Sequence, residues 1–289
     1  MNEKNKMFES YLKEEEKAEN TIMKYVHDIK EFYSWLITLH NNRRGELYEP
    51  EVTKEILLNY KEHLKKSKLK ATTINSKISS LNAFFIYTKN ESLKLKVLKC
   101  QKTIFGCKER ELTQTEYRKL YMACKDNNKL WLIIETISCT GIRVSELKYI
   151  THESLKNGKA VIDNKGKIRT ILLPSKLCIK LINYFHNNKF CREEPCEPVF
   201  TTRNGTPIDR KQTWQMLKKL AHKSGVPKEK VFPHNLRHLF AHEFYKSTHD
   251  IVKLASLLGH SSIETTRIYT KETEDECREA LERISFLRD

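Results

Sequence analysis

The sequence predicts a mainly α-helical protein of two domains, the second of which holds a small antiparallel β-sheet. Three observations predict this fold class. Apolar residues recur at helical spacing up to about residue 90, a lysine-rich stretch without that spacing follows, and two short β-like runs interrupt the helical pattern after residue 112. With 289 residues, the chain is longer than one typical domain and can bury a sizeable core.

The first domain is predicted from amphipathic helices within residues 1–90. The longest begins near Ile22, and its apolar positions are Tyr25, Val26, Ile29, Phe32, Tyr33 and Leu36, which recur every three or four residues. Two more helices are expected over 52–66 and 72–87, and in the second Ile74, Ile78, Leu81 and Phe85 share one face. Such stripes are typical of the core of a small helical domain.

A basic linker is expected over residues 91–111, because helical periodicity fades there. Its lysines are Lys94, Lys96, Lys99, Lys102 and Lys108. They either follow a DNA backbone or simply keep the segment soluble, and the sequence favours neither alternative, since attraction to phosphate requires no particular order of residues.

The second domain is predicted over residues 112–289. It opens with Thr113 and Glu116, which have the spacing of a capping box at a helix start. Helices are expected over 114–125 and 128–139, and the runs 159–163 and 168–173 are expected to form a hairpin around a turn at 164–167. The remainder is mainly helical, so this domain is α-rich with a small antiparallel sheet.

Composition favours a polyanionic partner. Lys and Arg number 53 against 37 Asp and Glu, a net charge of +16, which suits nucleic acid but also fits an ordinary solvated basic surface. The sequence has no apolar run of membrane-spanning length, and its first residues are charged rather than typical of a secretion signal. We therefore expect a cytoplasmic protein that does not enter a membrane.

The cysteines indicate neither a disulfide framework nor a metal site. Eight are scattered without regular spacing, which favours reduced thiols. Cys191 and Cys196 form the only close pair in the sequence, and no second pair stands at zinc-binding spacing. We predict no metal.

His234, Arg237 and His238 stand at i, i+3 and i+4, so a helix would present all three on one face. This face is poor core material, because burying an arginine between two histidines is costly without a compensating anion or carboxylate. It is either an exposed polar stripe or part of an anion site.

Two further polar side chains follow a helix end. The run 251–258 has helical periodicity, and Gly259 stands where a left-handed residue would end that helix, which places His260 in the following turn. Ser261 and Glu264 then have the spacing of another helix start, about two turns before Tyr269. A lone tyrosine there is usually half-buried packing, and only its neighbours suggest more.

Five motifs in one order carry a resemblance over essentially the whole chain. They are Thr140-Gly-Ile-Arg143 followed by Val-Ser-Glu-Leu, Lys165-Gly in the hairpin, His234-x-x-Arg237-His, Leu258-Gly-His260, and Thr265-Thr-x-x-Tyr269. The sequence resembles the tyrosine recombinases of the phage-integrase superfamily, and in size and layout it is similar to Xer-type recombinases and transposon integrases. The resemblance implies an amino-terminal, SAM-like core-binding domain and a carboxy-terminal catalytic domain.

The resemblance also implies the roles of the site residues. Tyr269 would attack the scissile phosphate and form a 3′-phosphotyrosine, without ATP, metal or other cofactor. Arg143 and Arg237 would bind the phosphoryl oxygens with paired hydrogen bonds, because forked guanidiniums match that geometry. His234 would accept the tyrosine proton, and His260 would contact a phosphoryl oxygen.

The proton for the departing 5′-oxygen comes in this family from a lysine on a hairpin. Lys165 fits that place, and Lys167 stays open as a substitute because the spacing to Arg169 is one residue tighter than the commonest pattern. Either lysine, taken without the resemblance, is an ordinary solvated turn charge. Glu146 is expected to hold Arg143 in position from the same helix face, and His238 either orients the site or fills space.

By the same resemblance the partner is double-stranded DNA, clamped between the two domains and recombined by a homotetramer in the synaptic complex, with accessory DNA-bending proteins as possible helpers. Candidate DNA contacts are Lys77, Arg210 and Lys211, the last two near a helix start. The amphipathic segment 275–289 is expected to dock on a neighbouring protomer or to pack in cis. A mobile element in a bacterial cytoplasm, close to the nucleoid, is the preferred setting.

Three other readings remain open at this point. A type IB topoisomerase shares the phosphotyrosine chemistry, although the compact size and the two histidines His234 and His260 fit a recombinase better. A DNA-binding protein without catalysis would have no use for a nucleophile such as Tyr269. An RNA-binding helical protein lacks support, since the sequence has neither an RNP-like aromatic motif nor a GXXG loop.

Overall fold

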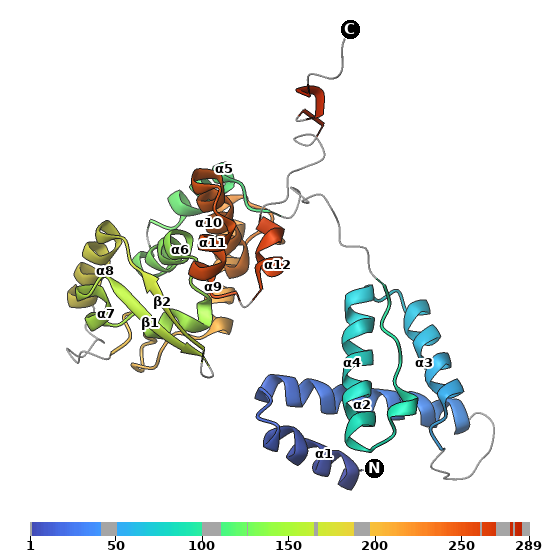
Figure 1. The fold of residues 1–289 in the computed structure, drawn as a ribbon. Helices are drawn as coiled ribbons and strands as arrows, with labels where there is room; N and C mark the ends of the chain where they lie inside the picture. Colours follow the sequence, from blue (N-terminus) through green and yellow to red (C-terminus); the bar gives the residue numbers. More distant parts are fainter. Residues whose placement is uncertain are drawn as a thin grey trace. The chain divides into compact units, whose positions relative to one another are not determined.

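The computed structural model describes residues 2–41, 51–99, 111–125, 127–164, 167–187, 197–260, 262–269, 278–279 and 281–284. The chain separates into two compact units, Met1–Lys102 and Thr103–Asp289 (Figure 1). The expected division into a helical first part and an α-rich second part with a small sheet is confirmed. Among the helices of these ranges, none is both long and apolar enough to cross a membrane.

The first unit is built from α1 (Asn2–Glu14), α2 (Glu19–Asn41), α3 (Lys54–Lys66) and α4 (Ala71–Tyr87). The last three confirm the expected helices, whereas α1 was not predicted. Its buried apolar residues are Phe8 and Leu12, one turn apart in a segment that is otherwise mostly charged or polar. Two apolar positions are too few for a recognisable stripe, so α1 forms mainly because it packs on α2 and α4.

The core of this unit is the stripe that periodicity predicts. Ile29, Phe32 and Leu36 of α2 are fully buried, and Ile78 of α4 is fully buried beside them. Phe8 of α1 closes the core, with its ring 5.2 Å from the ring of Phe84 in an edge-on contact. The amino-terminal unit therefore has a continuous aromatic and aliphatic interior.

The first part of the expected linker belongs to this unit. Residues Glu91–Leu93 form the short 3₁₀ helix η1, and the extended residues after them pack along α4. The Asn82 side chain exchanges two hydrogen bonds with the backbone of Leu95, at 2.8 and 2.9 Å, and Asn75 does the same with Leu98. Apolar periodicity missed this docking because side-chain amides make it. Residues 100–110 lie outside the described part of the chain.

The second unit begins with α5 (Gln114–Ala123), whose capping box between Thr113 and Glu116 is confirmed. It continues through α6 (Asn128–Thr140), the 3₁₀ helix η3 (Val144–Tyr149), α7 (His152–Lys156), β1 (Lys159–Asn164), β2 (Lys167–Leu172), α8 (Ser175–Asn187), α9 (Arg210–Ser224), α10 (Pro233–Thr248), α11 (Ile251–Leu258), α12 (Ile263–Thr266) and the 3₁₀ helix η4 (Arg267–Tyr269).

Strands β1 and β2 confirm the expected hairpin. They pair antiparallel, with Ile162 opposite Arg169 and Asn164 opposite Lys167, so two residues connect them. Those two residues, Lys165 and Gly166, lie outside the described part of the chain. Alternate residues of a strand share a face, and Ile171 is buried on the face that also carries Arg169.

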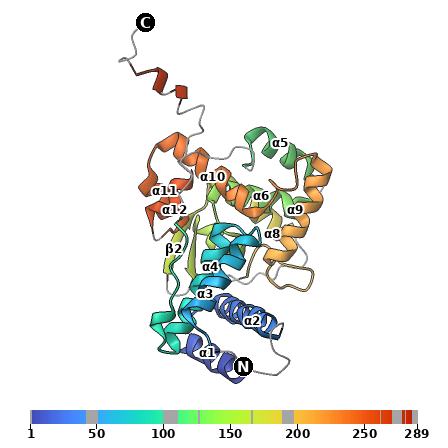
Figure 2. The ribbon, with the colours of Figure 1, turned by 90° about the vertical axis from the view of Figure 1, so that its right-hand side faces the viewer.

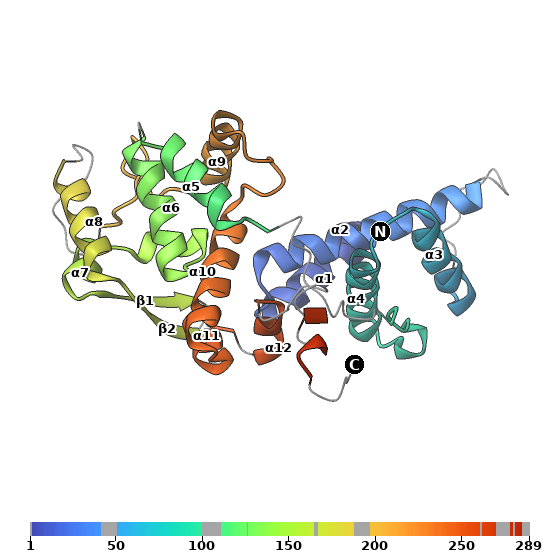
Figure 3. The same cartoon turned by 90° about the horizontal axis from the view of Figure 1, so that it is seen from above.

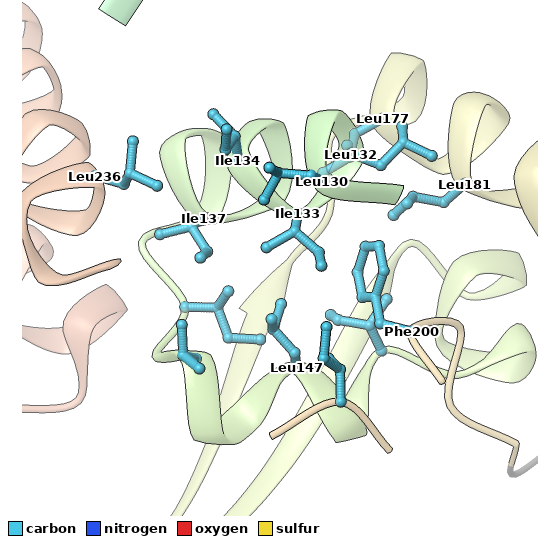
Figure 4. Close-up of a cluster of buried hydrophobic side chains, with 14 of the residues drawn as sticks. Leu130, Leu132, Ile133, Ile134, Ile137, Leu147, Leu177, Leu181, Phe200 and Leu236 are labelled. Carbon is cyan, nitrogen blue, oxygen red and sulfur yellow. The ribbon is translucent and has the colours of Figure 1, made fainter. Parts of the chain in front are cut away.

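Helix α6 is the centre of the second core. Figure 4 shows its side chains Ile133 and Ile137 on the side of Leu147 and Phe200, and Ile134 on the opposite side of the helix; Leu236 of α10 belongs to the same core. All of them are at most 1% exposed. Because α10 packs along α6, the residues at the start of α10 come close to the residues that follow α6.

A smaller apolar cluster joins the last helices. Ala241 of α10, Leu254 and Leu258 of α11, and Tyr269 of η4 are buried together. Helix α11 also touches β2, and Figures 2 and 3 show the ribbons of α10, α11 and α12 beside one another. The end of α6 and the segment that holds Tyr269 therefore lie against α10, and β2 lies against the neighbouring α11.

Candidate active site

Helix α10 starts with the predicted polar face. Pro233 occupies the first turn, where its missing N–H costs nothing, and His234, Arg237 and His238 follow on the side facing the end of α6. The rings of His234 and His238 meet edge to face, with centroids 4.4 Å apart. Sequence spacing placed these three side chains together, and the structure confirms that placement.

Arg237 is the most unusual of them, because its side chain is buried and only 2% of the residue is exposed. One terminal nitrogen donates to the Gly141 carbonyl at 2.6 Å, and the other donates to the Leu258 carbonyl at 2.7 Å. Burial, and then the charge of Arg143, lower its pKa to about 10, so it stays charged at neutral pH. The alternative of an exposed polar stripe is wrong for this residue.

Gly141 is required at the point where it meets Arg237. It ends α6 in the left-handed conformation, with φ of +65°, which a residue with a side chain adopts only at a cost. A Cβ atom there would lie 2.4 Å from a ring carbon of Phe240 and 3.0 Å from Leu258. The Thr140-Gly141 pair therefore turns the chain closely enough to offer the carbonyl to Arg237.

Arg143 follows two residues later and lies at the start of η3. Its backbone N–H donates to Glu146 Oε2 at 2.9 Å, and its guanidinium donates to Glu146 Oε1 at 3.1 Å. Glu146 was expected on the same α-helical face, but this stretch is a 3₁₀ helix that Arg143 precedes. The expected contact forms nevertheless, because a glutamate three residues on reaches back to the helix start.

Glu146 has a second basic partner. Arg169 of β2 donates to Glu146 Oε2 at 2.6 Å, and the side chains of Glu146 and Arg169 are 3% and 13% exposed. Burial lowers the pKa of Arg169, while Glu146 opposes that change. One carboxylate therefore lies between two guanidiniums, and Arg143, at 38% exposed, is the one that still faces solvent.

His260 lies in the turn that follows Gly259, as expected. Its Nε2 is 3.2 Å from a nitrogen of Arg237, and its Nδ1 is 2.9 Å from the Thr266 hydroxyl. Because a guanidinium only donates, Nε2 must accept, so the neutral ring carries its proton on Nδ1. Burial and the charges of Arg237, Arg143 and Arg169 lower the His260 pKa to about 4, in agreement with that tautomer.

Tyr269 belongs to η4, a 3₁₀ turn after α12, and is 4% exposed. Its ring stacks on His260, with centroids 6.0 Å apart and planes 15° from parallel. His238 meets the same ring edge on, at 4.6 Å. Tyr269 is therefore flanked by two histidines, one from the site turn and one from α10.

His234 and His238 of α10 both have lowered pKa values. Partial desolvation lowers the His234 pKa first, followed by the charges of Arg237, Arg143 and Arg210. Burial, and then His234 and Arg237, lower the His238 pKa to about 4. Both rings are therefore neutral at pH 7. His238 contacts His234 on one side and Tyr269 on the other, and its role in orienting the site stays a prediction.

A pocket of about 340 Å³ opens beside these residues. Arg143, His234 and Arg237 line it, together with Arg210 and Trp214 of α9. Arg210 and Lys211 are exposed at the start of α9, and Arg210 thus lies beside the site. The positive charge and the size of the pocket suit an anionic group.

Lys77 differs from the other predicted DNA contacts. It lies in α4, its side chain is 12% exposed, and its ammonium donates to Glu31 and Asp28. Two carboxylates already pair with Lys77, and its role as a DNA contact stays a prediction.

Several predicted residues are not available for comparison. Lys165 lies outside the described residues, and for Lys167 only its place in β2 opposite Asn164 is described. The pair Cys191 and Cys196 and most of 275–289 also lie outside them. The predictions of a general-acid lysine, of no metal and of a docking tail stay predictions.

Three residues of the site were not recognised in the sequence. Thr266 holds His260, Trp214 lines the pocket, and Arg169 binds Glu146. For Arg169 a signal existed, because β-strand alternation places it on the inward face with Ile171, where an arginine needs a buried partner. Thr266 and Trp214 carry no comparable pattern.

A buried arginine, two histidines flanking a tyrosine, and a second arginine at the rim of a basic pocket, all in an α-rich domain, define the class of tyrosine recombinases. The comparisons agree. Residues 110–276 match the phage integrase family, and residues 6–92 match the phage integrase N-terminal SAM-like domain. The chain belongs to the phage integrase family of tyrosine site-specific recombinases.

Relatives of known function span the chain. Tyrosine recombinase XerA of Pyrococcus furiosus is 31% identical over 97% of this chain and 93% of its own length. The TnP I resolvase of Bacillus thuringiensis is 30% identical over 96% of this chain and 98% of its own length.

Solved structures below 25% identity show the same fold. The XerH site-specific recombinase bound to its difH substrate aligns with a TM-score of 0.69, 21% identity, and coverage of 90% of this chain and 78% of that one. The Tn1549 transposon integrase bound to transposon right-end DNA also aligns with a TM-score of 0.69, at 19% identity over 98% and 99%.

Proposed function

We propose that this recombinase cleaves and rejoins strands of duplex DNA through a covalent bond to Tyr269. One observation carries the proposal. Three stretches distant in the sequence meet at Arg237, which contacts the residue after α6, the end of α11 and His260. Arg143 and Arg237 line one basic pocket, and Tyr269 stacks on His260. A domain that only binds DNA needs no tyrosine between two neutral histidines.

The reaction exchanges one phosphate ester for another. The Tyr269 oxygen forms a bond to phosphorus, the bond to the 5′-oxygen breaks, and the DNA 3′-end stays attached as a phosphotyrosine. A 5′-hydroxyl attacking that ester reverses the exchange and releases Tyr269. Because the phosphotyrosine ester conserves the energy of the broken phosphodiester bond, the residues present supply the chemistry without a nucleotide cofactor.

The arginines stabilise the charge that develops on the phosphoryl oxygens. Two carbonyls fix the Arg237 side chain, so its remaining N–H groups can bind a phosphoryl oxygen without the side chain having to move. Arg143 is held by Glu146 at the pocket rim. A bound phosphate would also raise the pKa of His260, since it compensates the cations that now lower it. His260 then donates to a phosphoryl oxygen.

Two proton transfers accompany the exchange. His234, neutral at pH 7, accepts the proton of Tyr269. His238 contacts both residues and orients the tyrosine ring. Lys165 gives a proton to the departing 5′-oxygen, with Lys167 as its alternative, since the hairpin of β1 and β2 is the family's place for this lysine.

Duplex DNA is the proposed partner. A net charge of +16 and the exposed Arg210 and Lys211 beside the pocket support it, and so do the DNA complexes of the XerH recombinase and the Tn1549 integrase. Residues 1–90 would act as the core-binding domain, 91–111 as the linker and 112–289 as the catalytic domain. Tetramers on DNA, with or without DNA-bending proteins, would form in a bacterial cytoplasm at the nucleoid.

Mobile-element DNA is the preferred target, because a resolvase and a transposon integrase are among the proteins similar to this chain. The tail 275–289 would dock on a neighbouring protomer. Removing it should leave strand cleavage intact and abolish cooperative assembly on paired sites, whereas unchanged assembly would show that it packs in cis.

The decisive experiment is trapping of the covalent adduct. Wild type and Tyr269→Phe are incubated with a library of nicked duplexes in EDTA, denatured, and separated by size. Tyr245→Phe is the matched control, because Tyr245 packs against the same apolar cluster. An adduct with wild type and Tyr245→Phe, but not with Tyr269→Phe, supports the proposal. Tight duplex binding without any adduct contradicts it.

A relaxation assay separates recombination from the alternative activity. A type IB topoisomerase relaxes a supercoiled plasmid without a specific site, whereas a recombinase exchanges strands between two copies of the selected sequence. Site-independent relaxation by wild type, lost in Tyr269→Phe, would assign the same chemistry to a topoisomerase.

A further inference from the structure

We propose that Arg169 is a positioning residue that holds Arg143 ready for the scissile phosphate by sharing the carboxylate of Glu146 and packing over Gly259. This inference rests on the proposed function. Arg169 lies in β2, outside the stretches that carry the other site residues. It contacts Glu146 and packs against Gly259, the residue before His260.

The first contact is with Glu146. Oε2 of this carboxylate accepts from Arg169, while Oε1 accepts from the Arg143 side chain. Because Arg169 takes part of the carboxylate's charge, Arg143 makes a single side-chain hydrogen bond to it and keeps its other N–H groups for a phosphate. Without Arg169, the full charge of Glu146 would hold Arg143, and the carboxylate would compete with the substrate.

The second contact is with the turn before His260. A Cβ atom on Gly259 would lie 2.4 Å from Cδ of Arg169 and 2.5 Å from one of its terminal nitrogens. The arginine therefore lies flat against the backbone of Gly259, whose φ of +63° ends α11. Glycine serves here both for the conformation and for this close approach.

The third observation concerns the hydrogen bonds of Arg169 itself. Among the described residues, its buried Nε–H has no hydrogen-bond partner. A buried donor without a partner is costly, so packing alone is a poor reason for an arginine at this place. Its charge also contributes to the lowered pKa values of Arg237 and His260.

The hairpin gains from the same contact. Arg169 stands opposite Ile162 and two residues after Lys167, so its bond to Glu146 ties the hairpin to η3. One side chain therefore sets the distance between the loop of Arg143, the turn of His260 and the strand next to Lys165.

The test compares two substrates in one protein preparation. Adduct formation is timed with Arg169→Gln on the normal duplex and on a duplex whose scissile phosphate is a neutral methylphosphonate, which needs less help from Arg143. We expect the rate relative to wild type to fall about 10- to 100-fold on the normal phosphate and less than about threefold on the methylphosphonate. The ratio does not depend on the folded fraction.

Thr170→Gln is the matched control, because Thr170 is the next residue of the strand and is exposed on the opposite face. A second variant, Glu146→Gln combined with Arg169→Gln, should lose no more than the worse single variant, since both act through one carboxylate.

Equal losses on the two substrates would reduce Arg169 to a structural residue, and an unchanged rate would remove it from the site. Additive losses in the double variant would also overturn the inference. Failure of the proposed function is recognised separately, because wild type would then form no adduct on either substrate.

Discussion

Asp28 in α2 and Glu146 in η3 are both nearly buried acids that contact two basic side chains, but they serve different purposes. Asp28 accepts from Lys24 and from Lys77, and Ser80 adds a third hydrogen bond. Although burial opposes it, the bonds from Lys24 and Ser80 lower the Asp28 pKa. With Glu31 also binding Lys77, this cluster leaves no obvious surplus of charge.

In the second unit the acid is outnumbered. Glu146 contacts the two arginines Arg143 and Arg169. A third arginine of the site, Arg237, is held by two carbonyls instead of a carboxylate. The cations are three arginines, whereas those around Asp28 are the two lysines Lys24 and Lys77. The difference teaches that a buried cluster with equal numbers of acids and bases can hold a fold together. A cluster with more cations than carboxylates prepares a site for an incoming anion.

The largest expected effect is that of the cation type. Arg237→Lys should lower the rate of adduct formation by about 10²–10³-fold, because a lysine cannot hold two carbonyls and a phosphate together. It should also cost roughly 2 kcal/mol of unfolding free energy, since one buried carbonyl loses its partner. In contrast, Lys24→Arg in the first unit should change stability by less than about 0.5 kcal/mol. Timed adduct formation and urea unfolding measure both.

If Arg237→Lys cleaved at the wild-type rate, the buried guanidinium would have no part in binding the phosphate. A large loss of stability in Lys24→Arg would show that the cluster around Asp28 also requires one particular type of cation.

The next effect concerns the acids themselves. Glu146→Gln should destabilise the second unit by about 3 kcal/mol, because it leaves two guanidiniums, Arg143 and Arg169, without their shared counter-charge. Asp28→Asn should cost only about 1 kcal/mol, since Lys24 is 42% exposed and can turn to water. Hydrogen exchange followed by mass spectrometry reports the two units separately. Equal costs would remove the distinction between the clusters.

A pH effect should follow from the buried histidines. In the folded protein His238 and His260 have pKa values of about 4, against an ordinary value of ~6.5. Between these values the unfolded chain binds more protons, so stability rises with pH. Lowering the pH from 7 to 4.5 should therefore cost on the order of 1 kcal/mol per histidine after allowance for solvent. Thermal unfolding of wild type and His238→Asn measures it, and an identical pH slope in the variant would contradict the assignment.

The smallest effect is on DNA affinity. Arg210→Gln should reduce the slope of log affinity against log salt by roughly one, because one phosphate contact is lost. Lys77→Gln should leave that slope unchanged, since Glu31 and Asp28 already occupy its ammonium. Binding titrations at several salt concentrations test both. A lower slope for Lys77→Gln would mean that DNA displaces its carboxylates.

Much of this architecture was predictable because it depends on local patterns. Periodicity located α2, α3 and α4, and the glycine after α11 placed His260 in its turn. Helical spacing also put His234, Arg237 and His238 on one face.

Long-range and backbone contacts were not predictable in the same way. The carbonyls that hold Arg237 come from residues 96 and 21 positions away, and carbonyls leave no trace in a sequence. Docking of Leu95 and Leu98 depends on asparagines of α4, whose amides look like ordinary surface groups. Arg169 was named only for its spacing, since its partner lies 23 residues earlier.

The carbonyls that bind Arg237 both stand at carboxyl-terminal ends of helices. Gly141 follows the last residue of α6, and Leu258 is the last residue of α11, so the negative ends of two peptide dipoles converge on one guanidinium. This partial charge is fixed in the backbone and cannot swing away or take up a proton. A buried arginine stabilised in this way needs no rival anion, and it meets each arriving phosphate with its full charge across the physiological pH range.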